Sequence, residues 1–157
     1  MEIRRATVED ANAVKAIYCH PEMAEIFFDD GIKPEQIDFS QLVNIPVAYF
    51  IIVSENGEDI GLFFFYPMNT ITFELHTAFL PGQRGAKVRD ASALARGYMW
   101  THTPCRKVVT SIPVDNRRAY VMAKLCCMKQ EGINRGSWLK NGQVIDQYTM
   151  GFCKEVA

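Results

Sequence analysis

The chain has 157 residues, 48% of them hydrophobic and 22% charged, with a formal net charge of -1 at pH 7. This length predicts a single domain, residues 1–157, whose core needs neither metals nor disulfides. The near-neutral charge argues against nucleic-acid binding and against anionic membranes as partners. Without a leader-like segment or a bilayer-spanning apolar run, we expect a cytoplasmic protein. The five cysteines are irregularly spaced and form no CxxC pair, which favours buried free thiols and no metal site.

The first quarter of the chain predicts a strand followed by helices. Residues 2–6 (EIRRA) have the composition of a strand, and residues 7–27 carry apolar side chains at helical spacing. Thr7 and Asp10 stand in capping-box spacing at the start of this helical region. Pro21 should divide it into two helices because proline breaks the helical hydrogen-bond ladder. Residues 28–44 allow either a short helix or a turn.

Three strands are predicted next, at residues 48–54, 60–66 and 70–80. Asn56-Gly57 is a strong hairpin turn signal between the first two, and a turn at residues 67–69 precedes the third. In the third strand Glu74 and His76 are two residues apart, so their side chains point to the same face of the sheet.

The remaining elements alternate between helix and strand. A loop containing GQRGAKVR leads to a helix beginning near Ala86, and its basic residues beside a helix start fit either an anion cradle or an ordinary turn. A strand at residues 107–114, a helix at 116–128 and two strands at 129–138 and 143–152 follow. The order β-α-α-β-β-β-α-β-α-β-β predicts an α+β fold with a mixed, mostly antiparallel sheet flanked by helices.

This order and three segments resemble the Gcn5-related N-acetyltransferases, which transfer acetyl groups from acetyl-CoA to amines. LPGQRGAKV (80–88) is similar to the signature between a strand and a helix in that family, and IPVDNRRAYVMAKLCCM (112–128) to its next strand-helix unit. EGINRGSWLKNGQVIDQYTMGF (131–152) resembles the final hairpin of members that acetylate protein N-termini. The segments are also similar to acetyltransferase-like proteins of tailed bacteriophages.

The resemblance implies acetyl-CoA as the co-substrate, bound where two parallel strands separate. Its pantetheine arm would pair with the backbone at the end of the third strand of the meander, a form of strand addition, and its pyrophosphate would bind the loop and the helix start. The residues implied for pantetheine are Ala78, Phe79 and Leu80, those for the pyrophosphate are Gln83, Arg84, Gly85, Ala86, Lys87 and Val88, and Asn116 would face the pantetheine or the thioester.

The chain departs from the family pattern at three positions. Lys87 and Arg89 stand where the family has glycines, which let the backbone approach the phosphates. Residues in a first helical turn do not need positive φ, however, and these two could supply positive charge. Ala123 stands where many members have a tyrosine that protonates the leaving thiolate. That role would pass to water, Tyr148 or another side chain, since Tyr120 lies about one turn too early.

Glu74 and His76 are the candidate catalytic bases, because acetyl transfer needs an unprotonated amine; the alternative is a structural pair on a partly solvated sheet face. We therefore expect an N-acetyltransferase that acts by direct transfer on a primary amine of a protein or a small molecule. The alternative function is a non-catalytic module of the same fold that serves protein interaction or phage assembly. A homodimer is compatible with the sequence, as is a location in host cytoplasm or virion if the protein is phage-encoded.

Overall fold

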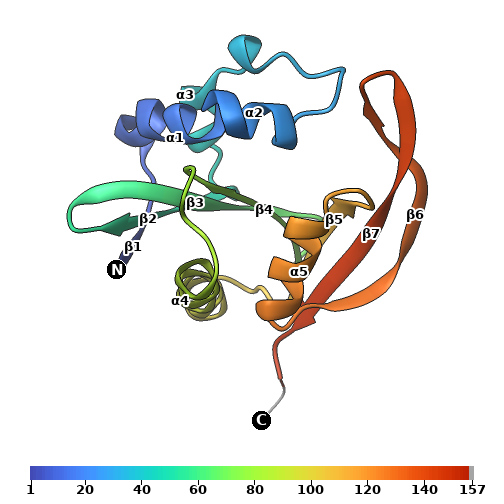
Figure 1. The fold of residues 1–157 in the computed structure, drawn as a ribbon. Helices are drawn as coiled ribbons and strands as arrows, with labels where there is room; N and C mark the ends of the chain where they lie inside the picture. Colours follow the sequence, from blue (N-terminus) through green and yellow to red (C-terminus); the bar gives the residue numbers. More distant parts are fainter. Residues whose placement is uncertain (156–157) are drawn as a thin grey trace.

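The computed structural model, which describes residues 1–155, is built on one seven-stranded sheet (Figure 1). Its strand order is β1-β2-β3-β4-β5-β7-β6. The pair β4–β5 is parallel and the other neighbouring pairs are antiparallel. This arrangement confirms the predicted α+β fold with a mixed, mostly antiparallel sheet.

The element order also agrees with the sequence. The strands are β1 Glu2–Arg5, β2 Tyr49–Glu55, β3 Glu58–Pro67, β4 Thr72–Phe79, β5 Lys107–Pro113, β6 Lys129–Lys140 and β7 Gln143–Cys153. The helices are α1 Ala11–Tyr18, α2 Pro21–Phe27, α3 Phe39–Val43, α4 Ala86–His102 and α5 Arg117–Leu125, with 3-10 turns η1 Val8–Asp10 and η2 Pro34–Gln36. The short helix α3 decides between the alternatives left open for residues 28–44.

Local sequence explains where several helices begin and end. Pro21 occupies the first turn of α2, as expected for a residue that cannot continue α1. The helix α5 ends at Leu125, not at Met128 as predicted. Cys127 has φ of 65°, its N–H donates to the carbonyl of Lys124, and the N–H of Met128 donates to Ala123. These two bonds form a Schellman motif, which stops the helix before the next strand.

The sheet buries a core on each face. One face packs against α1 and α3 through side chains that include Phe50, Leu62 and Ala78. The other packs against α4 and α5 through side chains that include Phe63, Leu75 and Phe79. In Figure 1 the first helices and the pair α4–α5 accordingly lie on opposite sides of the sheet.

The buried side of α4 includes one polar residue. Val88, Ala91, Ala95 and Met99 are buried together with Ser92, whereas His102 at the end of the helix is exposed. The Ser92 hydroxyl accepts a hydrogen bond of 2.9 Å from the Arg96 guanidinium, which lets a polar side chain occupy this position. No helix within residues 1–155 is long and apolar enough to cross a membrane.

Candidate active site

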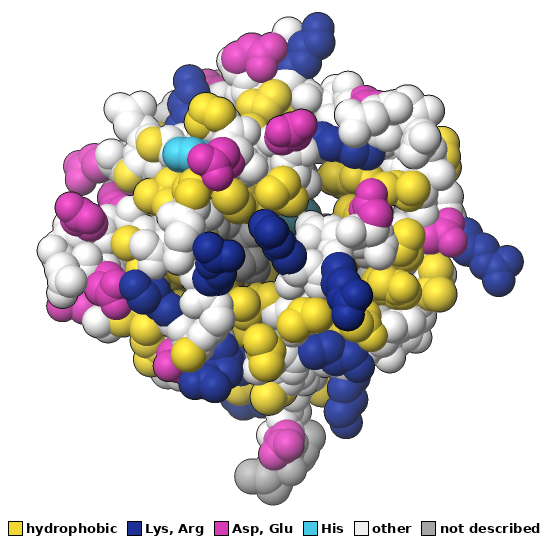
Figure 2. Space-filling view, in the orientation of Figure 1, with side chains coloured by type: hydrophobic (Ala, Val, Ile, Leu, Met, Phe, Trp, Pro, Cys, Tyr) yellow, Lys and Arg dark blue, Asp and Glu magenta, His cyan; other side chains and the backbone are white. Residues whose placement is uncertain are grey.

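The sheet opens between β4 and β5. The two strands pair only at Thr72–Lys107, Phe73–Val108 and Glu74–Val109. Beyond these residues β4 continues to Phe79 beside β3, while β5 continues beside β7. We call the space between the diverging strand ends the opening. Figure 2 shows the molecular surface hollowed over this region, with several Lys and Arg side chains around the hollow.

Backbone groups of β4 face the opening without a partner strand. The carbonyl of Ile71 accepts from Arg106 and Lys107 on the β5 side, whereas the N–H of Leu80 donates to Ile60 on the β3 side. Because backbone groups alternate between the two edges of a strand, Phe79 directs its N–H and C=O toward the opening. Of the three residues predicted to pair with pantetheine, Phe79 is therefore the best placed. Ala78 lies beside it with its side chain in the α1–α3 core.

The loop after β4 brings a helix N-terminus next to the opening. Gly82 and Gly85 have φ of 86° and 67°, which turns the chain sharply into α4. The first amide of α4 that bonds a helical carbonyl is that of Arg89, to Gly85. The amides of Ala86, Lys87 and Val88 precede it, so this end of the 17-residue helix carries N–H donors and the positive end of the helix dipole.

Cationic side chains surround the loop, and two of them form ion pairs. Lys87 forms an ion pair with Glu55 at the end of β2, and Arg89 pairs with its neighbour Asp90 at 2.8 Å. Arg84 is exposed in the loop. The first turn of α5 adds two further exposed arginines, Arg117 and Arg118.

Asn116 is the N-cap of α5. Its side-chain oxygen accepts a hydrogen bond of 3.1 Å from the N–H of Ala119, which satisfies one of the free amides at the helix start. This bond fixes the carboxamide at the strand-helix junction after β5 and uses its oxygen. The side-chain NH₂ is the group that Asn116 would offer to a ligand.

The two candidate bases lie together on β4, on the face toward α1–α3. Glu74 Oε2 is 3.7 Å from His76 Nε2, and the two side chains are 37% and 51% exposed. His76 holds the pKa of Glu74 below its usual value. The His76 ring also stacks on Phe64, with 5.8 Å between ring centroids. The structure therefore brings the pair together on a partly solvated face that α2 also contacts.

The structure also places Ala123, which stands where a tyrosine proton donor was expected, and the two tyrosines considered for that role, Tyr120 and Tyr148. Ala123 is 7% exposed, so it belongs to the core. Tyr120 donates its hydroxyl to Gln130 Oε1 at 3.1 Å, and its ring lies 4.9 Å from that of Tyr148. Tyr148 stands opposite Ile112, in the part of β5 that has left β4. Both tyrosines could be named from the sequence, but no sequence signal indicates that they contact each other.

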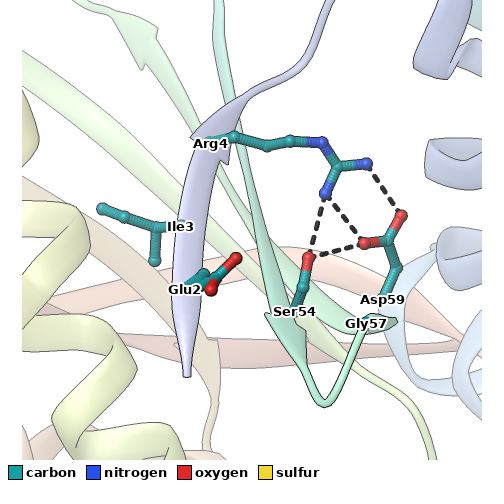
Figure 3. A pocket seen from close by; sticks show the side chains of 6 residues that line it. All are labelled: Glu2, Ile3, Arg4, Ser54, Gly57 and Asp59. Carbon is teal, nitrogen blue, oxygen red and sulfur yellow. Dashed lines mark hydrogen bonds and ion pairs between the residues drawn. The ribbon is translucent and has the colours of Figure 1, made fainter.

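A hollow of about 330 Å³ lies elsewhere, at the edge formed by β1, β2 and β3 (Figure 3). Its polar wall is a closed network. Arg4 donates to both carboxylate oxygens of Asp59 at 2.8 and 2.9 Å and to Ser54 at 3.0 Å. These groups satisfy one another and join the three strands, so we assign them a structural role.

The geometry defines a fold. An open mixed sheet whose parallel strands β4 and β5 separate beside a helix N-terminus is the fold of the Gcn5-related N-acetyltransferases. Spermidine N-acetyltransferase from Vibrio cholerae, solved in complex with CoA and spermine, superposes with a TM-score of 0.80 over 98% of this chain and 95% of its own, at 16% identity. Ribosomal-protein-S5-alanine acetyltransferase from Vibrio fischeri superposes with a TM-score of 0.79 over 98% and 92%, at 13% identity. At these identities the likeness establishes the fold.

Sequence comparison gives a different pair of relatives. Glutamate receptor 2.1 of Arabidopsis thaliana is 24% identical over 168 residues, covering 94% of this chain and 19% of that protein. Glutamate receptor 2.4 of the same plant is 27% identical over 117 residues, covering 63% and 13%. The chain thus spans less than a fifth of the length of these curated relatives. No family model matches the chain.

Proposed function

We propose that this chain is an acetyl-CoA-dependent N-acetyltransferase that transfers the acetyl group directly to a primary amine. The observation that carries the proposal is the opening, where unpartnered backbone of β4 leads into a loop and a helix N-terminus. A pantetheine arm needs backbone hydrogen bonds, and a pyrophosphate needs N–H donors and positive charge. The residues present at the opening supply both kinds of group.

The cofactor would be held mainly by backbone. The backbone of Phe79, which lies between Ala78 and Leu80, would bind the pantetheine, and the side-chain NH₂ of Asn116 would reach it from the α5 side. The amides of the β4–α4 loop and of the first turn of α4 would bind the pyrophosphate, through residues Gln83, Arg84, Gly85, Ala86, Lys87 and Val88. When bound, acetyl-CoA supplies an acetyl thioester as the electrophile.

The bases on β4 would handle the proton of the amine. Glu74, whose pKa is lowered by His76, is ionised at neutral pH and accepts the proton directly or through a water. The amine nitrogen would then bond to the acetyl carbon as the carbon–sulfur bond breaks, and its surplus proton would pass to water. Because Ala123 has no proton to give, water or the hydroxyl of Tyr148 protonates the sulfur.

Thermal melting with acetyl-CoA tests cofactor binding. A ligand present at one hundred times its dissociation constant stabilises the folded state by about 2.7 kcal/mol, which corresponds to about 5–10 °C for a domain of this size. We expect a shift in that range with acetyl-CoA and none with acetate. An unchanged melting temperature at millimolar acetyl-CoA would contradict the proposal.

Turnover tests the base. We expect Glu74→Gln to lower kcat by about 100-fold, the usual contribution of a general base, while the acetyl-CoA-induced melting shift stays. Glu9→Gln, which removes an exposed carboxylate from η1, is the matched control and should keep full activity. Thiol release should be measured with both polyamines and peptide amines, because the two solved neighbours are named for a polyamine and a protein alanine. Equal kcat for wild type and Glu74→Gln would exclude Glu74 as the base.

A non-catalytic module of the same fold is the second candidate. The observation that favours it is the buried alanine at position 123, where many of these enzymes carry a proton donor. Such a module would bind acetyl-CoA weakly or not at all and would release no thiol with any amine. The two assays above therefore separate the candidates.

A further inference from the structure

The sequence contains two Asn-Gly pairs, and each forms the turn of a β-hairpin. Asn56-Gly57 joins β2 to β3, and Asn141-Gly142 joins β6 to β7. The four residues have φ of 52°, 83°, 52° and 72° in chain order, and all of them are exposed. The two turns therefore share their composition, nearly the same backbone and access to water.

An Asn-Gly pair can lose the asparagine amide in water without an enzyme. The backbone nitrogen of the glycine attacks Cγ of the asparagine, a nitrogen–carbon bond forms, and the side-chain nitrogen leaves as ammonia. The proton of the glycine N–H passes to water, and the leaving nitrogen takes up a proton. Water then opens the cyclic imide to aspartate or isoaspartate, so the net reaction exchanges ammonia for water. Glycine favours the attack because it has no Cβ to restrict the backbone.

Asp30, in the segment after α2, binds the second of these turns. Its carboxylate accepts the N–H of Asn141 on Oδ1 at 2.9 Å and the N–H of Gly142 on Oδ2 at 2.8 Å. The N–H of Asp30 donates to the carbonyl of Leu139 at 3.1 Å, which fixes the segment against the hairpin. The nitrogen that would attack Asn141 is therefore held by a carboxylate.

The turn at Asn56 has no such partner in the described part of the chain. Neither its N–H nor that of Gly57 donates a hydrogen bond within residues 1–155. A Cβ at position 57 would meet nothing within 4 Å. In Figure 1 the β2–β3 turn projects from the sheet on the left, whereas the segment after α2 lies beside the tip of the β6–β7 hairpin. The nitrogen that would attack Asn56 is therefore free.

The bonds to Asp30 should slow the reaction at Asn141. The nitrogen of Gly142 must turn away from the carboxylate and toward Cγ of Asn141 before it attacks, so its hydrogen bond has to break first. A hydrogen bond to a charged group shifts such a local equilibrium by about tenfold or more. Asp30 is also a poor base for the amide proton, because the N–H groups of Gly142 and Asn141 hold its pKa below the usual value.

The free turn adjoins the proposed cofactor loop. Glu55, the residue before Asn56, forms the ion pair with Lys87 in the first turn of α4. Deamidation of Asn56 creates a second carboxylate next to Glu55 and adds a negative charge beside the start of α4. This charge would repel a pyrophosphate bound there, and the repulsion would fade at high salt.

We propose that Asn56 is the deamidation site of this protein, that Asp30 protects the equivalent turn at Asn141, and that the carboxylate formed at position 56 weakens cofactor binding. The last part rests on the proposed binding of acetyl-CoA. The modification needs only water, and it is irreversible, so the affinity for the cofactor would fall as the protein ages.

Mass spectrometry of incubated protein tests the site. Wild type, Asp30→Ala and Asp29→Ala are kept in a mildly alkaline buffer, and conversion of each asparagine to aspartate or isoaspartate is followed in its peptide. The same measurement in urea gives the rate of each pair in the unfolded chain, and the ratio of the two rates is the protection by the fold. We expect the protection of Asn141 to exceed that of Asn56 by about tenfold or more in wild type, and the two to become similar in Asp30→Ala. Asp29→Ala removes a carboxylate that accepts from Gly31 in its own loop, and it should behave as wild type.

Three results would overturn the assignment. The first is equal protection of Asn56 and Asn141 in wild type, a result that needs no variant. The second is unchanged protection of Asn141 in Asp30→Ala, since the turn itself would then slow the reaction. The third is faster loss at Asn141 in wild type than in Asp30→Ala, which would make the carboxylate a base that promotes the attack.

Calorimetry with acetyl-CoA tests the effect on binding. Asn56→Asp should weaken binding about threefold at low salt and less at high salt. Asn69→Asp is the matched control, because it adds the same charge in the β3–β4 turn, at the other end of β3, and should leave binding unchanged. Equal affinities of wild type and Asn56→Asp would overturn this part alone. If wild type does not bind acetyl-CoA, this part falls together with the proposed function, whereas the protection measured at Asn56 and Asn141 stands by itself.

Discussion

Replacing Gly61 by alanine should destabilise the protein and disturb the end of β4. Gly61 lies opposite Phe79 in the β3–β4 ladder. A Cβ at position 61 would be 2.3, 2.5 and 2.7 Å from three atoms of the Phe79 ring, whereas ordinary contact begins at 3.4 Å. The ring must therefore move by about 1 Å. It has little room to do so, because it is 6% exposed and packs edge-on against Phe63.

The magnitude follows from two opposing effects. Overpacking a core costs about 1–3 kcal/mol, and replacing glycine by alanine within a strand returns about 0.5–1 kcal/mol of conformational entropy. We expect a net loss of about 1–2 kcal/mol, which lowers the melting temperature by about 2–8 °C. Because Phe79 also faces the opening, the stabilisation by acetyl-CoA should shrink in the same variant.

Thermal melting of a small set of variants tests this reasoning. Gly97→Ala is the control, since Gly97 is exposed inside α4 and an added Cβ there meets nothing within 4 Å; it should raise stability by about 1 kcal/mol. In Gly61→Ala combined with Phe79→Leu, the cost of the alanine should largely vanish because the ring is gone. We would reject this explanation if Gly61→Ala were as stable as wild type. We would also reject it if the losses of stability from Gly61→Ala and Phe79→Leu simply added in the double variant.

Three other substitutions have predictable effects. Cys127→Gly should raise the free energy of unfolding by about 1 kcal/mol, because glycine adopts the φ of 65° at the end of α5 without strain; a urea titration in reducing buffer measures it. Asp59→Asn should lower stability by about 1 kcal/mol at pH 7, since Asp59 binds Arg4 through both oxygens. Arg4 lowers the pKa of Asp59 in the folded state, so the difference from wild type should persist above pH 3.8 and disappear as the pH falls below it. Glu55→Gln should strengthen acetyl-CoA binding severalfold, because it frees the Lys87 ammonium beside the loop, and the gain should shrink at high salt. Weaker binding by calorimetry would mean that the Lys87–Glu55 pair holds the loop in its binding conformation.

The fold was predictable because its signals are local. The two Asn-Gly pairs adopt the positive φ angles of two-residue hairpin turns at Asn56 and Asn141, as their composition indicates. Pro21 separates α1 from α2 for reasons contained in one residue. The alternation of side chains along a strand is equally local, and it suffices to place Glu74 and His76 on one face of β4.

The contacts that shape the candidate site were not predictable in the same way. Asp30 and Asn141 are 111 residues apart, and nothing in either segment names the other as its partner. The Asn-Gly turn does predict two amides outside the ladder, but their acceptor depends on how the helical layer packs on the sheet. The end of α5 was missed for a related reason, since the left-handed residue is a cysteine and carries no glycine signal.

The two departures in the β4–α4 loop weigh less against cofactor binding than the sequence indicated. Glycines matter in such a loop where φ is positive or where a Cβ blocks a ligand. Here α4 begins at Ala86, so Lys87 and Arg89 have helical backbone, and the positive φ angles fall on Gly82 and Gly85. The side chain of Lys87 is held by Glu55 and that of Arg89 by Asp90. In the proposed function, anion binding by the loop would therefore depend on its amides and the α4 dipole, which the two substitutions leave in place.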